Sequence, residues 1–104
     1  MERSIPPDTL KRILAGQFVL DVRRAADRDA SPEQLAGATW RDPEKLAEWA
    51  DDLPKDRDIV LYCVRGGGVS NSVVDALRAR GLEAGFIEGG IEGWKAAGGE
   101  VVGK

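Results

Sequence analysis

The stretch that decides the fold is Ile59-Val-Leu-Tyr-Cys-Val-Arg-Gly-Gly-Gly-Val-Ser70, or IVLYCVRGGGVS. It opens with a continuous apolar run over residues 59–62, which is typical of a strand covered on both faces of a sheet. Three glycines follow, and apolar residues then recur at helical spacing from residue 70 until Gly81. The stretch predicts a strand, a glycine-rich loop and an amphipathic helix, with Cys63 at the end of the strand.

The segments on either side alternate between strand and helix patterns. Further strands are predicted for residues 18–22, 35–40 and 84–87, and short helices for residues 6–14, 43–53 and 91–97. The polar segment 23–33 is either a surface loop or an irregular helix. Alternation of this kind predicts an α/β fold with a mostly parallel sheet and helices on both faces. The length of 104 residues predicts a single domain, residues 1–104.

Charge and hydropathy limit the partners that we expect. The net charge is -3 and the isoelectric point is about 5.0, whereas nucleic-acid binding needs a basic surface. No run approaches the ~20 apolar residues of a membrane helix. We therefore expect neither nucleic acid nor membrane as a partner, and any anion site must be local.

The cysteine and histidine counts limit the chemistry. One cysteine cannot form an internal disulfide, and the start of the sequence lacks the apolar segment of a secretory signal, so we expect a reducing, cytoplasmic setting. The absence of histidine excludes Cys-His and Ser-His dyads. A zinc site would need one cysteine and carboxylates alone, so no metal and no cofactor are expected.

The loop after Cys63 has the composition of an anion-binding turn. Gly66, Gly67 and Gly68 can direct backbone N–H groups inward beside a helix N-terminus, whose dipole favours negative charge. The same setting lowers the pKa of a thiol, ordinarily about 8.5, so a nucleophile can form without a separate base. The alternative is an inert buried cysteine beside a glycine turn. A phosphate-binding P-loop does not fit, because its Gly-Lys-Ser/Thr ending is missing.

Four motifs in order resemble one known family. They are Leu20-Asp-Val-Arg23, Leu35-Ala-Gly-Ala38, Val60-Leu-Tyr-Cys63 and Ile87-Glu-Gly-Gly-Ile-Glu-Gly-Trp94. Over nearly its whole length the chain resembles a single-domain rhodanese, a thiosulfate sulfurtransferase-like protein. The resemblance implies a rhodanese-like α/β fold with a mostly parallel central sheet of about five strands flanked by helices on both faces.

The resemblance also implies a reaction and a site. Cys63 is then the nucleophile, which takes sulfur from thiosulfate or a related small anionic donor and passes the persulfide sulfur to cyanide or a thiol. A protein sulfur acceptor is a further partner to consider. The residues that cradle the donor are Val64, Arg65, Gly66, Gly67, Gly68, Val69 and Ser70.

Three departures from the family keep alternatives open. Glu33-Gln34 stands where the family has Gly-His. The cysteine loop is one residue longer than the common rhodanese loop, a length similar to that of rhodanese-related phosphatases and arsenate reductases. Those loops end in an arginine, and this chain has Val69 there. The alternatives are a sulfur-acceptor or docking module without turnover, and a phosphatase-like or arsenate reductase-like activity.

Several other side chains carry predictions of their own. Arg65 either contacts the donor anion or points to solvent. Asp21 and Arg23 are interpreted as an internal brace. Ser70 is expected at the N-cap or in the first turn of the following helix, with a hydrogen bond to the sulfur as a second role. The tryptophans are expected in the core or in groove walls, and one of them can flank the thiol; they are Trp40, Trp49 and Trp94.

Overall fold

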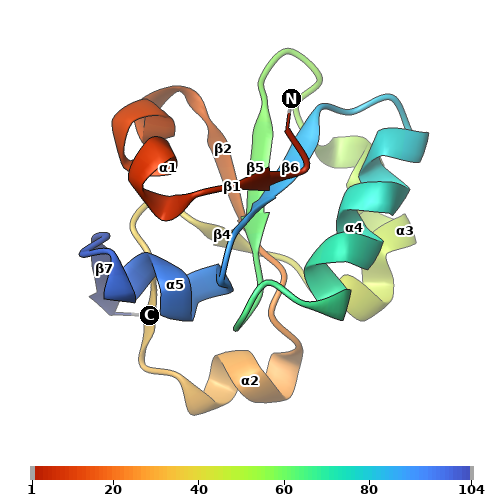
Figure 1. Cartoon of the computed structure of the whole chain (residues 1–104). Helices are drawn as coiled ribbons and strands as arrows, with labels where there is room; N and C mark the ends of the chain where they lie inside the picture. The colour runs from red at the N-terminus through yellow and green to blue at the C-terminus, as the bar shows by residue number, and fades with distance from the viewer. Residues whose placement is uncertain (1, 104) are drawn as a thin grey trace.

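The apolar segment at the centre of the sequence forms β5 (Ile59–Tyr62), the middle strand of a five-stranded sheet in the computed structural model, which describes residues 2–103. The strand order is β1-β6-β5-β2-β4, and every neighbouring pair is parallel (Figure 1). The other strands of this sheet are β1 (Ser4–Ile5), β2 (Phe18–Asp21), β4 (Thr39–Trp40) and β6 (Ala84–Ile87). The predicted parallel sheet is confirmed.

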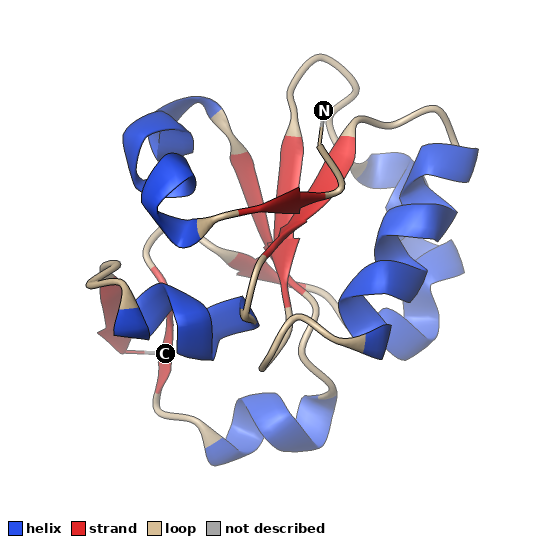
Figure 2. Ribbon diagram, in the orientation of Figure 1, coloured by secondary structure: helices blue, strands red, loops and turns tan. Residues whose placement is uncertain are grey.

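Helices cover both faces of the sheet, as Figure 2 shows. One face carries α1 (Pro7–Ile13) and α5 (Gly90–Ala96), and the other carries α3 (Leu46–Trp49) and α4 (Gly68–Ala79). A further helix, α2 (Ala25–Ala30), lies beyond the carboxyl ends of β2 and β5. Short 3-10 turns follow α1 and flank α3, at Leu14–Gly16, Pro43–Lys45 and Ala50–Asp52. The layered α/β architecture is the one that the sequence predicts.

The side chains of β5 show why its sequence lacks polar alternation. Ile59 and Leu61 pack into the cluster under α3 and α4, whereas Val60 and Tyr62 pack into the cluster under α1 and α5. All four side chains are fully buried. Burial on both faces requires a continuous apolar run, and it holds the end of β5 rigidly in place.

One local prediction is wrong in detail. The predicted strand 35–40 is two strands, β3 (Glu33–Leu35) and β4, because Gly37 turns the chain with a φ of 79°. β3 pairs antiparallel with β7 (Val101–Gly103), which the sequence analysis does not anticipate. The segment 23–33, for which the sequence allows either a loop or an irregular helix, contains α2.

None of the helices in the described part of the chain is long and apolar enough to cross a membrane.

Candidate active site

Cys63 follows β5 directly, at the carboxyl edge of the sheet, and its side chain is 7% exposed. The hydroxyl of Ser70 donates a hydrogen bond to its sulfur over 3.0 Å. Backbone N–H groups of Gly66, Gly67 and Ser70 also donate to the sulfur. Burial alone raises the pKa of the Cys63 thiol, but these hydrogen bonds outweigh burial and lower the pKa below its ordinary value. The loop therefore favours a thiolate without a neighbouring imidazole or lysine.

Ser70 lies in the first turn of α4 and not at its N-cap. The helix begins at Gly68, with Gly67 as the N-cap residue, two positions earlier than the apolar periodicity suggests. Ser70 is buried, and its hydroxyl and its backbone N–H both serve the cysteine sulfur. Its predicted first-turn position and its predicted hydrogen bond to the sulfur are both present.

The three glycines of the loop have different structural requirements. Gly66 has a φ of 72°, and a Cβ there would lie 2.9 Å from the backbone nitrogen of Gly89. Gly67 and Gly68 would present a Cβ to open space, with nothing within 4 Å. Glycine is therefore sterically required at position 66. At positions 67 and 68 the absence of a side chain leaves the space above the sulfur open.

The late Gly89-Gly90 turn supports the cysteine loop from behind. Ile91 N–H donates to the carbonyl oxygen of Cys63 over 3.0 Å, and Glu92 N–H donates to that of Val64 over 3.2 Å. A Cβ on Gly90 would collide with the same two carbonyl groups. The first amides of α5 thus bind the carbonyl groups of Cys63 and Val64. The sulfur is left to the backbone N–H groups of the residues that follow, Gly66, Gly67 and Ser70. The second glycine motif is part of the site although it is 26 positions later in the chain.

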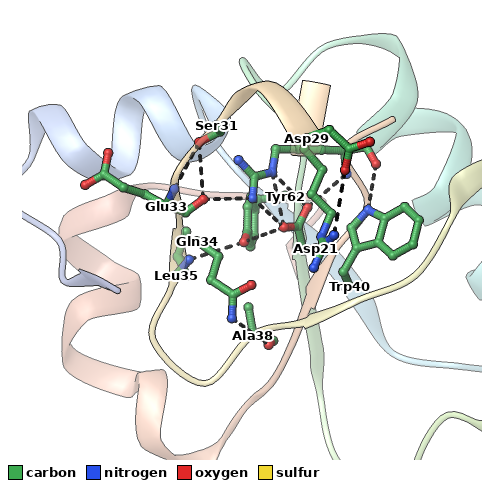
Figure 3. Close-up of polar contacts among 11 residues, drawn as sticks. Asp21, Asp29, Ser31, Glu33, Gln34, Leu35, Ala38, Trp40 and Tyr62 are labelled. Atoms are coloured by element: carbon green, nitrogen blue, oxygen red, sulfur yellow. Dashed lines mark hydrogen bonds and ion pairs between the residues drawn. The ribbon is translucent and has the colours of Figure 1, made fainter. Parts of the chain in front are cut away.

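A buried polar cluster fixes the strand ends that carry the site (Figure 3). Asp21 and Arg23 are 0% and 1% exposed, and Arg23 Nη2 lies 2.8 Å from Asp21 Oδ2. The hydroxyl of Tyr62 donates to the same oxygen over 2.9 Å and accepts a hydrogen bond from Leu35 N–H over 3.2 Å. The predicted brace is confirmed. Tyr62, the residue directly before the cysteine, also belongs to it, although its sequence context does not predict this.

The phenol of Tyr62 remains a donor because its pKa is raised. Burial is the main cause, and the carboxylate of Asp21 adds to it. Arg23 extends the cluster to β3 by donating from Nη2 to the carbonyl oxygen of Glu33 over 3.0 Å, and its own carbonyl accepts from Trp40 Nε1 over 2.9 Å. These hydrogen bonds join residues in or next to β2, β3, β4 and β5 (Figure 3).

A cavity of about 410 Å³ opens above the sulfur. It is lined by Arg23, Arg24, Asp27, Cys63, Val64, Arg65, Gly67, Gly68 and Val69. All the site residues predicted from sequence are thus brought together, with Gly66 and Ser70 behind the sulfur as hydrogen-bond donors and the others at the cavity wall. None of the three tryptophans lines this cavity; Trp49 and Trp94 lie in the core, and Trp40 is half-buried against Arg28.

Two charged residues of this wall were not predicted. Arg24 and Asp27 come from the start of α2, which the sheet topology brings opposite the cysteine loop. The guanidinium groups of Arg24 and Arg65 form no hydrogen bond or ion pair with any of residues 2–103. The cavity therefore presents two unpaired cations beside a lowered-pKa thiol. The apolar Val69 adds no third charge at the end of the loop.

Comparison with known proteins places this geometry in a family. The chain matches the Rhodanese-like domain over residues 6–97. It is 36% identical over 61 residues to a tRNA sulfurtransferase of Shewanella pealeana; the match covers 57% of this chain and 13% of the length of that protein.

Two solved structures are similar over nearly the whole chain. A rhodanese-related protein from Thermoplasma volcanium has a TM-score of 0.86 and 29% identity, covering 97% of this chain and 98% of that one. A thiosulfate sulfurtransferase from Pseudomonas aeruginosa has a TM-score of 0.82 and 25% identity, covering 99% of this chain and 20% of that one. The chain belongs to the family of rhodanese-like domains.

Proposed function

We propose that this protein is a sulfurtransferase in which Cys63 takes sulfane sulfur from thiosulfate, or a related anion, and transfers it to cyanide or a thiol. The observation that carries the proposal is the environment of the sulfur. One hydroxyl and three backbone amides donate to it, its pKa is lowered, and unpaired arginines line the cavity above it. Family membership and the likeness to two sulfurtransferases support the same reaction class.

The first half-reaction loads the cysteine. The Cys63 thiolate attacks the outer sulfur of thiosulfate, a new S–S bond forms to the cysteine, and the bond between the two donor sulfurs breaks. Its electron pair leaves with sulfite, and the enzyme carries a persulfide anion. The amides of Gly66, Gly67 and Ser70, which stabilise the thiolate, can then hold the negative charge of the persulfide.

The second half-reaction removes the transferred sulfur from Cys63. Cyanide attacks the outer sulfur of the persulfide, thiocyanate departs, and the electron pair of the broken S–S bond returns to Cys63 as thiolate. No general base is needed in either step, because the nucleophiles are anions. This accounts for a site built without histidine.

Arg65 is proposed to attract the donor. It lines the cavity with an unpaired guanidinium, and a dianion such as thiosulfate is favoured next to it. Phosphoryl transfer spreads charge over three oxygens and is usually met by cations at the end of the loop, where this chain has Val69. The site therefore favours sulfur transfer over a phosphatase-like or arsenate reductase-like activity.

The setting and extent of the protein are part of the proposal. A thiolate nucleophile must stay reduced, which fits a cytoplasmic location. The five-stranded sheet, with one cluster of core residues on each face, fits one domain over residues 1–104.

The direct test is a thiosulfate:cyanide assay with thiocyanate detection. The purified protein should form thiocyanate with ping-pong kinetics, and Cys63→Ser should form none. Formation of a stable persulfide that cyanide does not discharge would favour the sulfur-acceptor module without turnover.

A further inference from the structure

We infer that the site has a second compartment, which holds the body of a carboxylate-bearing thiol acceptor while the thiol itself reaches the persulfide on Cys63. The inference deepens the proposed function and rests on it. It starts from a cavity of about 180 Å³ lined by Arg24, Pro43, Glu44, Val69, Ser72 and Val73. We call this space the adjoining cavity.

The adjoining cavity lies next to the one above the cysteine. Arg24 and Val69 line both spaces. The remaining walls come from α4 and from the 3-10 turn before α3. That turn is well anchored: Asp42 accepts from Glu44 N–H over 2.9 Å, and Trp49 Nε1 donates to the carbonyl of Asp42 over 2.8 Å. The compartment therefore has ordered walls on its far side.

Small substrates leave this space unexplained. Thiosulfate has five heavy atoms and cyanide has two, and the cavity of about 410 Å³ above the sulfur is ample for either. A second compartment beside it fits an acceptor with a longer body. Its apolar walls, Pro43, Val69 and Val73, suit methylene groups.

The charges indicate which acceptor fits. Arg24 stands at the junction with an unpaired guanidinium, which is suited to a carboxylate. Asp27 lines only the cysteine side and repels a carboxylate held there, so the carboxylate is directed toward the adjoining cavity. Glu44, on the far wall, has no ion pair within residues 2–103 and can receive an amine. These features together fit a small peptide-like thiol.

The transfer step balances without an oxidant or reductant. The thiol sulfur of the acceptor attacks the outer sulfur of the persulfide anion, and the S–S bond to Cys63 breaks. The electron pair of that bond returns to Cys63 as thiolate, and the thiol proton passes to the transferred sulfur. The product is the hydropersulfide of the acceptor.

The experiment isolates this half-reaction. Protein loaded with thiosulfate and then desalted is mixed with glutathione, 2-mercaptoethanol or cyanide, and loss of the persulfide is followed by mass spectrometry. The test variants are Arg24→Gln and Ser72→Phe, the latter filling the adjoining cavity. Their matched controls are Arg12→Gln, an exposed arginine on α1, and Ala79→Phe, an exposed position two turns further along α4.

We expect each test variant to lower the rate with glutathione, relative to the rate with cyanide, by about tenfold, as for loss of one charge-assisted hydrogen bond or of a fitted pocket. The ratio with 2-mercaptoethanol, which lacks a carboxylate and a long body, should change far less. The controls should leave all three rates at the wild-type level. Equal slowing of every acceptor, or no slowing with glutathione, would overturn the inference.

A binding measurement separates this inference from the proposed function. S-methylglutathione cannot accept sulfur, so its binding to unloaded protein is measured by calorimetry whether or not a persulfide forms. Binding that is weakened by Arg24→Gln and Ser72→Phe, but not by the controls, supports the adjoining cavity as the site. Absence of binding to the wild type would contradict it even if thiosulfate:cyanide turnover is normal.

Discussion

The hydroxyl of Ser70 donates a hydrogen bond to the sulfur of Cys63 across 3.0 Å, and both side chains are buried. The two residues lie on opposite sides of the glycine loop, since Cys63 directly follows β5 and Ser70 lies in the first turn of α4. Their contact joins the first turn of α4 to the sulfur on the side away from the cavity. It also makes the nucleophile depend on how the helix begins, and this dependence can be measured.

Replacing Ser70 by alanine should raise the pKa of the Cys63 thiol, because one of the hydrogen bonds that lower it is lost. The thiolate is the reactive form, so the rate of alkylation by iodoacetamide rises with pH and levels off above the thiol pKa. The profile of Ser70→Ala should be displaced to higher pH, with a rate at neutral pH lower by roughly three- to tenfold. At high pH, where both proteins are fully ionised, the rates should converge. Superimposable profiles would mean that the hydroxyl does not act on the sulfur.

The glycines of the loop should differ in their tolerance of a methyl group. Gly66→Ala places a Cβ at a φ of 72° against the backbone of the Gly89-Gly90 turn and should lower the free energy of unfolding by about 1–3 kcal/mol. Gly68→Ala meets open space at the first residue of α4 and should be neutral or slightly stabilising. Urea unfolding of both variants measures the difference. Equal stabilities would contradict the close approach of the two glycine turns.

Truncation of Arg65 tests the cation at the cavity wall. If Arg65 binds the donor in its ground state and transition state alike, Arg65→Ala should raise the KM for thiosulfate by about tenfold and leave kcat nearly unchanged. Steady-state thiocyanate formation measures both constants, and Arg12→Gln serves as a charge-matched control on another face. An unchanged KM would show that Arg65 does not take part in donor binding.

Much of the fold can be predicted from the sequence because buried faces of strands and helices give a regular spacing of apolar residues. β5 and α4 are buried on both faces and on one face respectively, so their patterns are unambiguous. α2 has no buried residue, and the sequence therefore cannot distinguish it from a loop. β1 and β7, with two and three residues, are too short to show any period, and pairing with distant strands defines them.

The candidate site was predictable only where its residues are contiguous. The loop from Cys63 to Ser70 follows from one local motif, whereas Arg24 and Asp27 enter the cavity through the sheet topology. Tyr62 reads as one more apolar residue of a buried strand, because its hydroxyl finds its partner, Asp21, 41 positions earlier in the chain. Contacts of this kind have no local sequence signal.

The position at the end of the loop should determine which anion the site prefers. Val69 lines the cavity without charge, so the wild type should hydrolyse an aryl phosphate negligibly. Val69→Arg should make phosphate and arsenate stronger competitive inhibitors of thiosulfate turnover, by about tenfold for one added charge-assisted contact. Inhibition constants from the thiocyanate assay measure this. Appreciable phosphatase turnover by the unmodified protein, with no thiocyanate formed from thiosulfate and cyanide, would reverse the proposed reaction class.

The most direct test of the central claim is the intact mass of the protein after incubation with thiosulfate. Because Cys63 is the only thiol in the sequence, the account predicts a gain of one sulfur atom, complete reversal by cyanide, and no gain in Cys63→Ser. A wild-type mass that does not change, or an adduct that persists in Cys63→Ser, would contradict it.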